Sequence, residues 1–272
     1  MVTVKTDKEI RIIREGGRIL AGIMKKIQDE IKPGVTTGRL EQMACSLIKE
    51  AGGRPSFKGY KSGQDGVAFP TALCASINDE VVHTPALPSR RVNGGDIIGV
   101  DLGMEYPFSG KSAKSGFRGG RGYYTDMAVT VGVGKISGEA KKLIKVTKKS
   151  LELAIKRIRP GGTLNDVAEA VQSYVEANGF SVVRDLVGHG VGYAVHEDPQ
   201  IPNYVARGRK FDNVVLKAGM VLAIEPMVNA GSHEIKSMPD GMTIKTADGR
   251  LSAHFEHTIA VTEAGCEIIT KL

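Results

Sequence analysis

Four acidic residues stand where acids are rare, inside or at the ends of β-branched, apolar runs that are typical of strands. They are Asp101, Asp126, Glu225 and Glu256. Strands disfavour acids, and four buried carboxylates would repel one another or take up protons unless cations neutralised them. Carboxylates that bridge two metal ions about 3.5–4 Å apart are typical of two-metal hydrolases. One such acid alone would favour a surface ion pair, but the four together predict a dinuclear metal site.

Histidines could complete this site. His189 stands in the glycine-rich stretch GHGVG at 188–192, where the backbone can approach a ligand closely, and it offers a nitrogen donor. His83 and His196 each follow a valine and precede a turn-like segment. Beside a metal centre they could donate to a developing oxyanion or carry a proton at neutral pH. His254 shares a face with Glu256 by strand alternation, so it could also line the site.

Other site chemistries lack their sequence motifs. The chain has no G-x-S-x-G, G-x-x-x-x-G-K-[ST] or H-E-x-x-H pattern. Its three cysteines, Cys45, Cys74 and Cys266, are far apart and form no C-x-x-C pair. We therefore expect neither a disulfide framework nor a structural zinc site, and a reducing compartment suits the chain.

The elements that must position these residues repeat once along the chain. The segment IKPGVT at 31–36 recurs as IRPGGT at 158–163. Each copy lies between two stretches of helical periodicity. The helices predicted in this way span 7–31, 40–51, 138–158 and 167–178. Thr6 and Glu9 are placed as a capping box for the first, and Gly52 and Gly179 suit C-caps of the second and fourth.

The strand regions align as well. The alignment matches Asp101 with Glu225, Asp126 with Glu256, and His83 with His196. Each half reads as two helices followed by strands, without strict βαβα alternation, which predicts an α+β fold with a mainly antiparallel sheet. We expect one domain, 1–272, built of two halves, about 1–135 and 136–272, related by a pseudo-twofold axis near which the acids converge.

Composition sets the broad class. The 272 residues are 41% hydrophobic and 25% charged, which is ordinary for a globular protein and excludes a disordered, collagenous or coiled-coil chain. No apolar run is long enough to span a membrane, and the charged N-terminus does not resemble a signal peptide. We expect a cytoplasmic protein. The net charge of +7 is compatible with nearby nucleic acid but is also usual for a solvated surface.

The matched motifs carry a resemblance to a known family. They are SINDEVVH at 76–83, GVD at 99–101, GHGVG at 188–192, VHE at 195–197, IEPM at 224–227 and FEHT at 255–258. On these segments the sequence resembles the type I methionine aminopeptidases, which share the pita-bread metallopeptidase fold of family M24 with prolidase and aminopeptidase P. The resemblance runs from the first predicted helix to the last strand.

The resemblance implies an activity and roles for particular residues. The activity is removal of the initiator methionine from nascent proteins whose second residue is small, through attack of a metal-activated water on the first peptide bond. The implied metal ligands are Asp101, Asp126, His189, Glu225 and Glu256. Glu225 would also act as general base, while His83 and His196 would contact the substrate and stabilise the tetrahedral intermediate. The methionine pocket would be formed by Phe69, Cys74 and His83, with Met242 at its rim.

The family resemblance also implies cofactors and partners. Two divalent ions are expected, and mixed carboxylate and imidazole ligation admits Co, Mn, Fe or Zn. Family members carry a monovalent-cation site nearby, to which Asn78 and Ser252 correspond loosely. A monomer is expected by analogy.

The sequence departs from the family pattern in three ways. Asp101 and Asp126 are separated by a basic, glycine-rich insertion at about 104–124, which supplies +3 of the net charge. Met242 stands where a Trp is common. His254 replaces a usual Gln, and Thr84 replaces a usual Gly. We hypothesise that the insertion contacts ribosomal RNA through phosphates; the alternative is a solvated loop.

Two rival functions stay open from the sequence. An Xaa-Pro peptidase would use the same metal ligands with a different pocket and domain content. A pseudo-enzyme of the same fold would only bind RNA or ribosomes, since function depends on the site rather than on the fold. Retention of all five ligand-type residues argues against the pseudo-enzyme.

Overall fold

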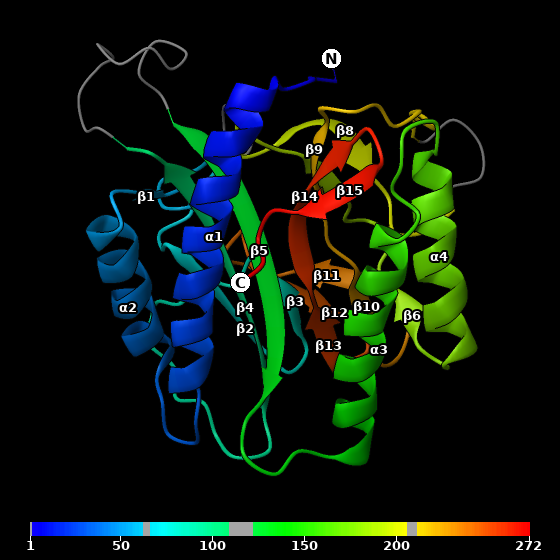
Figure 1. The fold of residues 1–272 in the computed structure, drawn as a ribbon. Helices are drawn as coiled ribbons and strands as arrows, with labels where there is room; N and C mark the ends of the chain where they lie inside the picture. The colour runs from blue at the N-terminus through cyan, green and yellow to red at the C-terminus, as the bar shows by residue number, and fades with distance from the viewer. Residues whose placement is uncertain (1, 62–65, 109–121, 206–210) are drawn as a thin grey trace.

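The computed structural model describes residues 2–61, 66–108, 122–205 and 211–272 (Figure 1). The helices span Asp7–Glu30 (α1), Thr37–Glu50 (α2), Gly138–Ile155 (α3) and Leu164–Ala177 (α4). The strands before α3 are Arg54–Pro55 (β1), Leu73–Ile77 (β2), Glu80–Val82 (β3), Ile97–Tyr106 (β4) and Tyr123–Gly132 (β5). Those after α4 are Ser181–Val182 (β6), Gly188–Gly190 (β7), Glu197–Ile201 (β8), Val221–Ile224 (β9), Met227–Asn229 (β10), Ile235–Ser237 (β11), Ile244–Thr246 (β12), Ser252–His254 (β13), Glu256–Thr262 (β14) and Gly265–Ile268 (β15).

The main sheet crosses both halves of the chain. Its strands follow the order β1-β4-β5-β14-β9-β7-β8, with β2 added to β4 and β15 added to β14. Two small sheets, β13-β10-β6 and β11-β12-β3, accompany it. All strand pairs among the described residues are antiparallel. In Figure 1, α1 and α2 flank one half of the sheet and α3 and α4 flank the other, which confirms the predicted α+β architecture.

Threonine side chains cap α1, α2 and α4, and Ser137 caps α3. Thr6 accepts from the backbone N–H of Glu9, whose side chain accepts from the N–H of Thr6, so the predicted capping box is confirmed. Thr163 and Asp166 form a second capping box at α4, and Thr36 caps α2 by accepting from the backbone N–H of Arg39. These two helices therefore begin three residues before the predicted 40 and 167, because the caps stand earlier than the first apolar repeats suggest.

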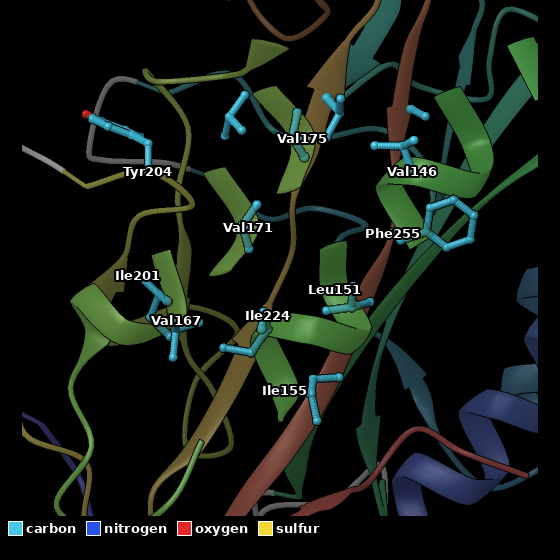
Figure 2. Close-up of a cluster of buried hydrophobic side chains, with 14 of the residues drawn as sticks. Val146, Leu151, Ile155, Val167, Val171, Val175, Ile201, Tyr204, Ile224 and Phe255 are labelled. Atoms are coloured by element: carbon cyan, nitrogen blue, oxygen red, sulfur yellow. The ribbon is translucent and has the colours of Figure 1, made fainter. Parts of the chain in front are cut away.

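Each half buries its own apolar core between its helices and its share of the sheet. In the first, Leu20 and Leu40 of α1 and α2 pack in one cluster with Val100 of β4. Figure 2 shows the second, in which Leu151 of α3 and Val171 of α4 belong to one cluster that includes β9 and β14. The two cores hold the helix pairs against the sheet, so the strands that carry the candidate site residues have a rigid support.

The two halves meet at strands β5 and β14. The Thr258 hydroxyl accepts from the backbone N–H of Asp126 (2.9 Å) and donates to the Asp126 carbonyl (2.8 Å). The Thr130 hydroxyl makes the same two bonds with the N–H and carbonyl of His254, at 2.9 and 2.8 Å. These reciprocal bonds are related by a local twofold axis.

The axis corrects one detail of the sequence alignment. It passes through the strand pair Ala128 and Glu256, so that Asp126 corresponds to His254 rather than to Glu256. The alignment was therefore wrong by two residues in this strand, although the match of Asp101 with Glu225 agrees with the registers on either side. A shift of two residues leaves side chains on the same face of a strand, so both acids still face the site.

Two further sequence expectations concern membrane-spanning helices and the basic insertion. None of the helices in the described ranges combines the length and apolarity needed to cross a membrane. The basic insertion follows β4 and precedes β5, and these strands pair up to Tyr106 and Tyr123. Residues 109–121, which contain all four of its basic side chains, lie outside the described residues.

Candidate metal and substrate site

The five predicted ligands come from five strands that are neighbours in the sheet order β4-β5-β14-β9-β7. They are Asp101 (β4), Asp126 (β5), Glu256 (β14), Glu225 (directly after β9) and His189 (β7). All five line one cavity of about 370 Å³. The small sheet β11-β12-β3 and its flanks contribute to the same cavity through Val82, Ser237 and Ile244. The fold therefore brings together residues that are up to 155 positions apart in the sequence.

Donor atoms of these residues lie close enough to share cations. Ligand atoms of Asp126, His189 and Glu256 lie within 4.8 Å of one another, and Nε2 of His189 is 3.4 Å from Oε1 of Glu225. Nδ1 of His189 is 2.9 Å from the Gly190 carbonyl, which can only accept, so Nδ1 carries the proton. Nε2 is then a free lone pair beside the carboxylates, which is the tautomer a metal ligand needs.

Close packing of two strands requires a glycine at position 188, directly before His189. A Cβ added to Gly188 would collide with the carbonyl oxygen of Ala223 on the adjacent strand. Only glycine lets β7 approach β9 this closely, and β7 pairs with β9 at His189 and Ala223. The GHG motif thus places the imidazole against the sheet that carries the acids.

The acids are buried, and no lysine or arginine of the described residues pairs with them. Asp101 Oδ1, Asp126 Oδ1 and Glu256 Oε1 are buried and have no hydrogen-bond partner among the described residues. Burial and the neighbouring carboxylates raise the pKa of Asp101 and of Glu256 well above their usual values, and burial raises the pKa of Asp126 to about 7. Unpaired buried carboxylates at this density are stable when cations neutralise them. The donor set fits divalent metal ions.

His83 and His196 both line the cavity, as the sequence predicts. The His196 ring stands edge-on to the His189 ring, with centroids 4.5 Å apart, and its Nδ1 is 2.7 Å from the Tyr60 hydroxyl. His83 follows β3 in a left-handed conformation, with φ of 57°, which is uncommon for a non-glycine residue and is frequent at functional sites. Loss of solvation inside the cavity lowers the pKa of both imidazoles, that of His196 to about 3, so both are neutral near pH 7.

An apolar wall adjoins these polar groups. Phe69, Cys74 and Met242, predicted from the sequence, line the cavity together with Phe57 and Tyr60, which sequence reasoning missed. The Phe57 and Phe69 rings meet edge to face, with centroids 6.4 Å apart. Phe57 and Tyr60 lie between β1 and β2, outside the matched motifs. The one sequence feature that indicates them is the presence of two aromatic residues three positions apart in a loop.

Three further predicted residues take specific places. His254 is buried, and its Nε2 lies 3.7 Å from Oε2 of Glu225. It therefore touches a candidate ligand, although it is not among the residues that line the cavity. The carbonyl of Asn78 accepts from the backbone N–H of Ser252 at 2.8 Å, so these two loosely matched residues lie side by side.

Comparisons with known proteins place the chain in a family. The sequence model of Metallopeptidase family M24 matches residues 11–263. The chain belongs to this family. Methionine aminopeptidase 1 of Bacillus subtilis is 45% identical over 273 residues, covering all of both chains. The crystal structure of methionine aminopeptidase from Thermotoga maritima superposes with a TM-score of 0.88 at 42% identity, again over all of both chains, so this member of family M24 has the pita-bread fold.

A prolidase shares the fold but less of the sequence. The structure of a prolidase from Pyrococcus horikoshii OT3 gives a TM-score of 0.73 at 22% identity. The match covers 98% of this chain but 63% of the prolidase. This likeness shows the fold alone.

Proposed function

We propose that this member of family M24 is a methionine aminopeptidase that removes the initiator methionine from nascent proteins whose second residue is small. One observation carries the proposal. The cavity joins the carboxylate and imidazole cluster to an apolar wall that contains Phe69, Cys74 and Met242. Such a wall suits an unbranched thioether side chain, and full-length relatives that share 40 to 45% of its residues are methionine aminopeptidases.

In this proposal five residues hold two divalent ions, which are Co, Mn, Fe or Zn. They are Asp101, Asp126, His189, Glu225 and Glu256. Divalent ions bound by such a set supply Lewis acidity and activate water for attack on a carbonyl. Their donors agree with the mixed carboxylate and imidazole ligation that these metals accept. A monovalent cation would bind near Asn78 and Ser252.

The chain's own groups then carry the proton transfers and orient the substrate. Burial and the charge of Asp126 raise the pKa of Glu225 well above its usual value in the metal-free protein. With cations bound, the ionised Glu225 carboxylate would take the proton of the attacking water as general base. His83 and His196 are neutral near pH 7, and a ring N–H from each can donate to the scissile carbonyl oxygen as negative charge develops on it. The apolar wall fixes the first side chain, which positions the first peptide bond at the acids.

The proposed partners follow from this role. The substrates are N-termini of nascent chains, so we place the enzyme in the cytoplasm, as a monomer. We also propose that the basic insertion at 104–124 contacts the ribosome, which is supported by its charge of +3 and by phosphate attraction. Deletion of 107–121 should weaken salt-sensitive co-sedimentation with ribosomes. Unchanged co-sedimentation would show that this contact is wrong.

Methionine release tests the proposed activity. The metal-stripped protein is assayed with Met-Ala-Ser and with Ala-Pro-Ala, each with and without added Co²⁺ or Mn²⁺. We expect metal-dependent release of methionine from the first peptide and no cleavage of the second. Cleavage of the proline peptide alone would assign the chain to the Xaa-Pro branch. Silence on both peptides, with metal bound, would favour the ribosome-binding pseudo-enzyme.

A further inference from the structure

The first residues of the chain are tied to the segment that carries His196. The Nζ of Lys5 is 2.9 Å from Oε2 of Glu197, and the two side chains are 1% and 8% exposed. The Thr3 hydroxyl donates to the same oxygen at 2.5 Å. The backbone N–H of Lys5 donates to the Gly219 carbonyl. A buried lysine paired with a buried glutamate, 192 residues away in the sequence, fixes the N-terminal segment against the site.

The other oxygen of Glu197 holds the segment between β7 and β8. Its Oε1 accepts from the backbone N–H groups of Tyr193 and Ala194. The bonds from Thr3 and Lys5 lower the pKa of this carboxyl although its burial opposes the shift, so Glu197 is ionised near pH 7. One carboxylate therefore connects the N-terminal segment to the turn that immediately precedes His196.

A second carboxylate makes the complementary connection. Glu9, in the first turn of α1, accepts from the Tyr193 hydroxyl at 2.9 Å and from the Tyr123 hydroxyl at 3.3 Å. The Lys5 ammonium also lies 5.0 Å from the centre of the Tyr193 ring, within the range of a cation–π contact. The segment around Tyr193 is thus held at both its backbone and its side chain by residues 3–9.

We propose that the buried Lys5–Glu197 pair is a positioning element for His196. Residues 191–196 form no strand, so the direction of the His196 ring depends on its neighbours. Val195 is buried in the apolar wall, and Glu197 is fixed by Thr3 and Lys5. The N-terminal segment acts on the reaction through the angle at which His196 meets the substrate, without contacting the substrate itself.

Lys5→Met tests this inference, because it keeps most of the apolar stem and removes the ammonium. A displaced donor can cost about tenfold or more in rate, so we expect kcat to fall about tenfold with KM little changed. The matched control is Lys25→Met, which breaks an exposed ion pair with Asp29 and should leave both constants unchanged. Thr3→Val removes the hydroxyl that donates to Glu197 and accepts from the Lys5 ammonium, but it keeps the Lys5–Glu197 ion pair. It serves as a second variant if Lys5→Met does not fold.

A double-mutant cycle separates positioning from general stability. In a His196→Ala background, Lys5→Met should cost less than about twofold, because the residue it positions is absent. An equal loss of kcat in both backgrounds would overturn the inference. These kinetic measurements rest on the proposed function, so a second measurement must be independent of methionine release.

That readout is the ¹⁵N resonances of the His196 ring in the zinc-loaded enzyme, assigned by comparison with His196→Ala. They should shift in Lys5→Met and in Thr3→Val but not in Lys25→Met. If the ring resonances are unchanged in both Lys5→Met and Thr3→Val, the positioning role is refuted. A wild-type protein that releases no methionine would refute the proposed function and leave this spectral test decisive.

Discussion

Thr258 binds the backbone of Asp126 at both its N–H and its carbonyl through a single buried hydroxyl, at 2.9 and 2.8 Å. Thr130 makes the same pair of bonds with His254, so a variant of Thr130 is a matched control for a variant of Thr258. Thr258→Val and Thr130→Val should each lose about 1–3 kcal/mol of unfolding free energy, since each leaves a buried N–H and carbonyl unpaired. Urea unfolding measures this loss.

The two variants should differ in metal binding. Thr258→Val releases the backbone of a proposed ligand, so it should weaken Mn²⁺ binding, whereas Thr130→Val should leave the affinity close to that of the wild type. Calorimetric titration of the metal-stripped proteins gives both values. Equal affinities in the two variants would show that Thr258 does not position Asp126 for a metal.

Thermal stability of the metal-free protein should fall as the pH rises from about 6.5 to about 8. Burial raises the pKa of Asp126 to about 7 and the pKa values of Asp101, Glu225 and Glu256 well above their usual range. An acid whose pKa is raised by folding contributes stability at low pH that is lost as the pH passes through its folded value. Histidines such as His189, whose pKa burial lowers to about 4, oppose this trend only below their unfolded pKa of about 6.5.

Excess Mn²⁺ should reverse that slope. Metal binds the folded state and displaces the protons of its ligands, so its stabilisation grows with pH. Calorimetric melting temperatures at the two pH values, with chelator and with Mn²⁺, check both signs. A melting temperature of the metal-free protein that rises over this interval would contradict the buried, protonated carboxylates.

Met242→Ala should raise KM for Met-Ala-Ser about fivefold with kcat unchanged. The half-buried side chain belongs to the apolar wall, and loss of roughly 1 kcal/mol of apolar contact acts equally on bound substrate and transition state. Met43→Ala, a half-buried methionine on α2 outside the cavity, is the control. A KM that stays at the wild-type value would place the methionine side chain elsewhere.

Much of the fold was predictable because its signals are local. The Thr6 capping box, apolar periodicity and the Pro-Gly turns mark the helices, and acids in apolar strands mark the candidate metal site. The strand register was not predictable to the residue, because aligning Asp126 with Glu256 satisfies the same alternation as the observed match with His254. Period-two patterns do not distinguish shifts of two residues.

The contacts that support the site were beyond the sequence for a different reason. Lys5 and Glu197 are distant in the sequence and come into contact only in the folded protein. Neither belongs to a sequence pattern that predicts the other as its partner. Phe57 and Tyr60 likewise approach the cavity from a loop, where no periodicity fixes which way a side chain points. Long-range partners of this kind require the three-dimensional arrangement.

The central claim is that five residues from five adjacent strands hold the metal ions on which methionine release depends. The direct test counts Mn²⁺ bound per chain by equilibrium dialysis, alongside methionine release, for the wild type, Asp126→Asn and the exposed control Asp29→Asn. We predict two ions and full activity for the wild type and the control, with loss of bound metal and of activity together in Asp126→Asn. Two bound ions and a wild-type rate in Asp126→Asn would contradict the account.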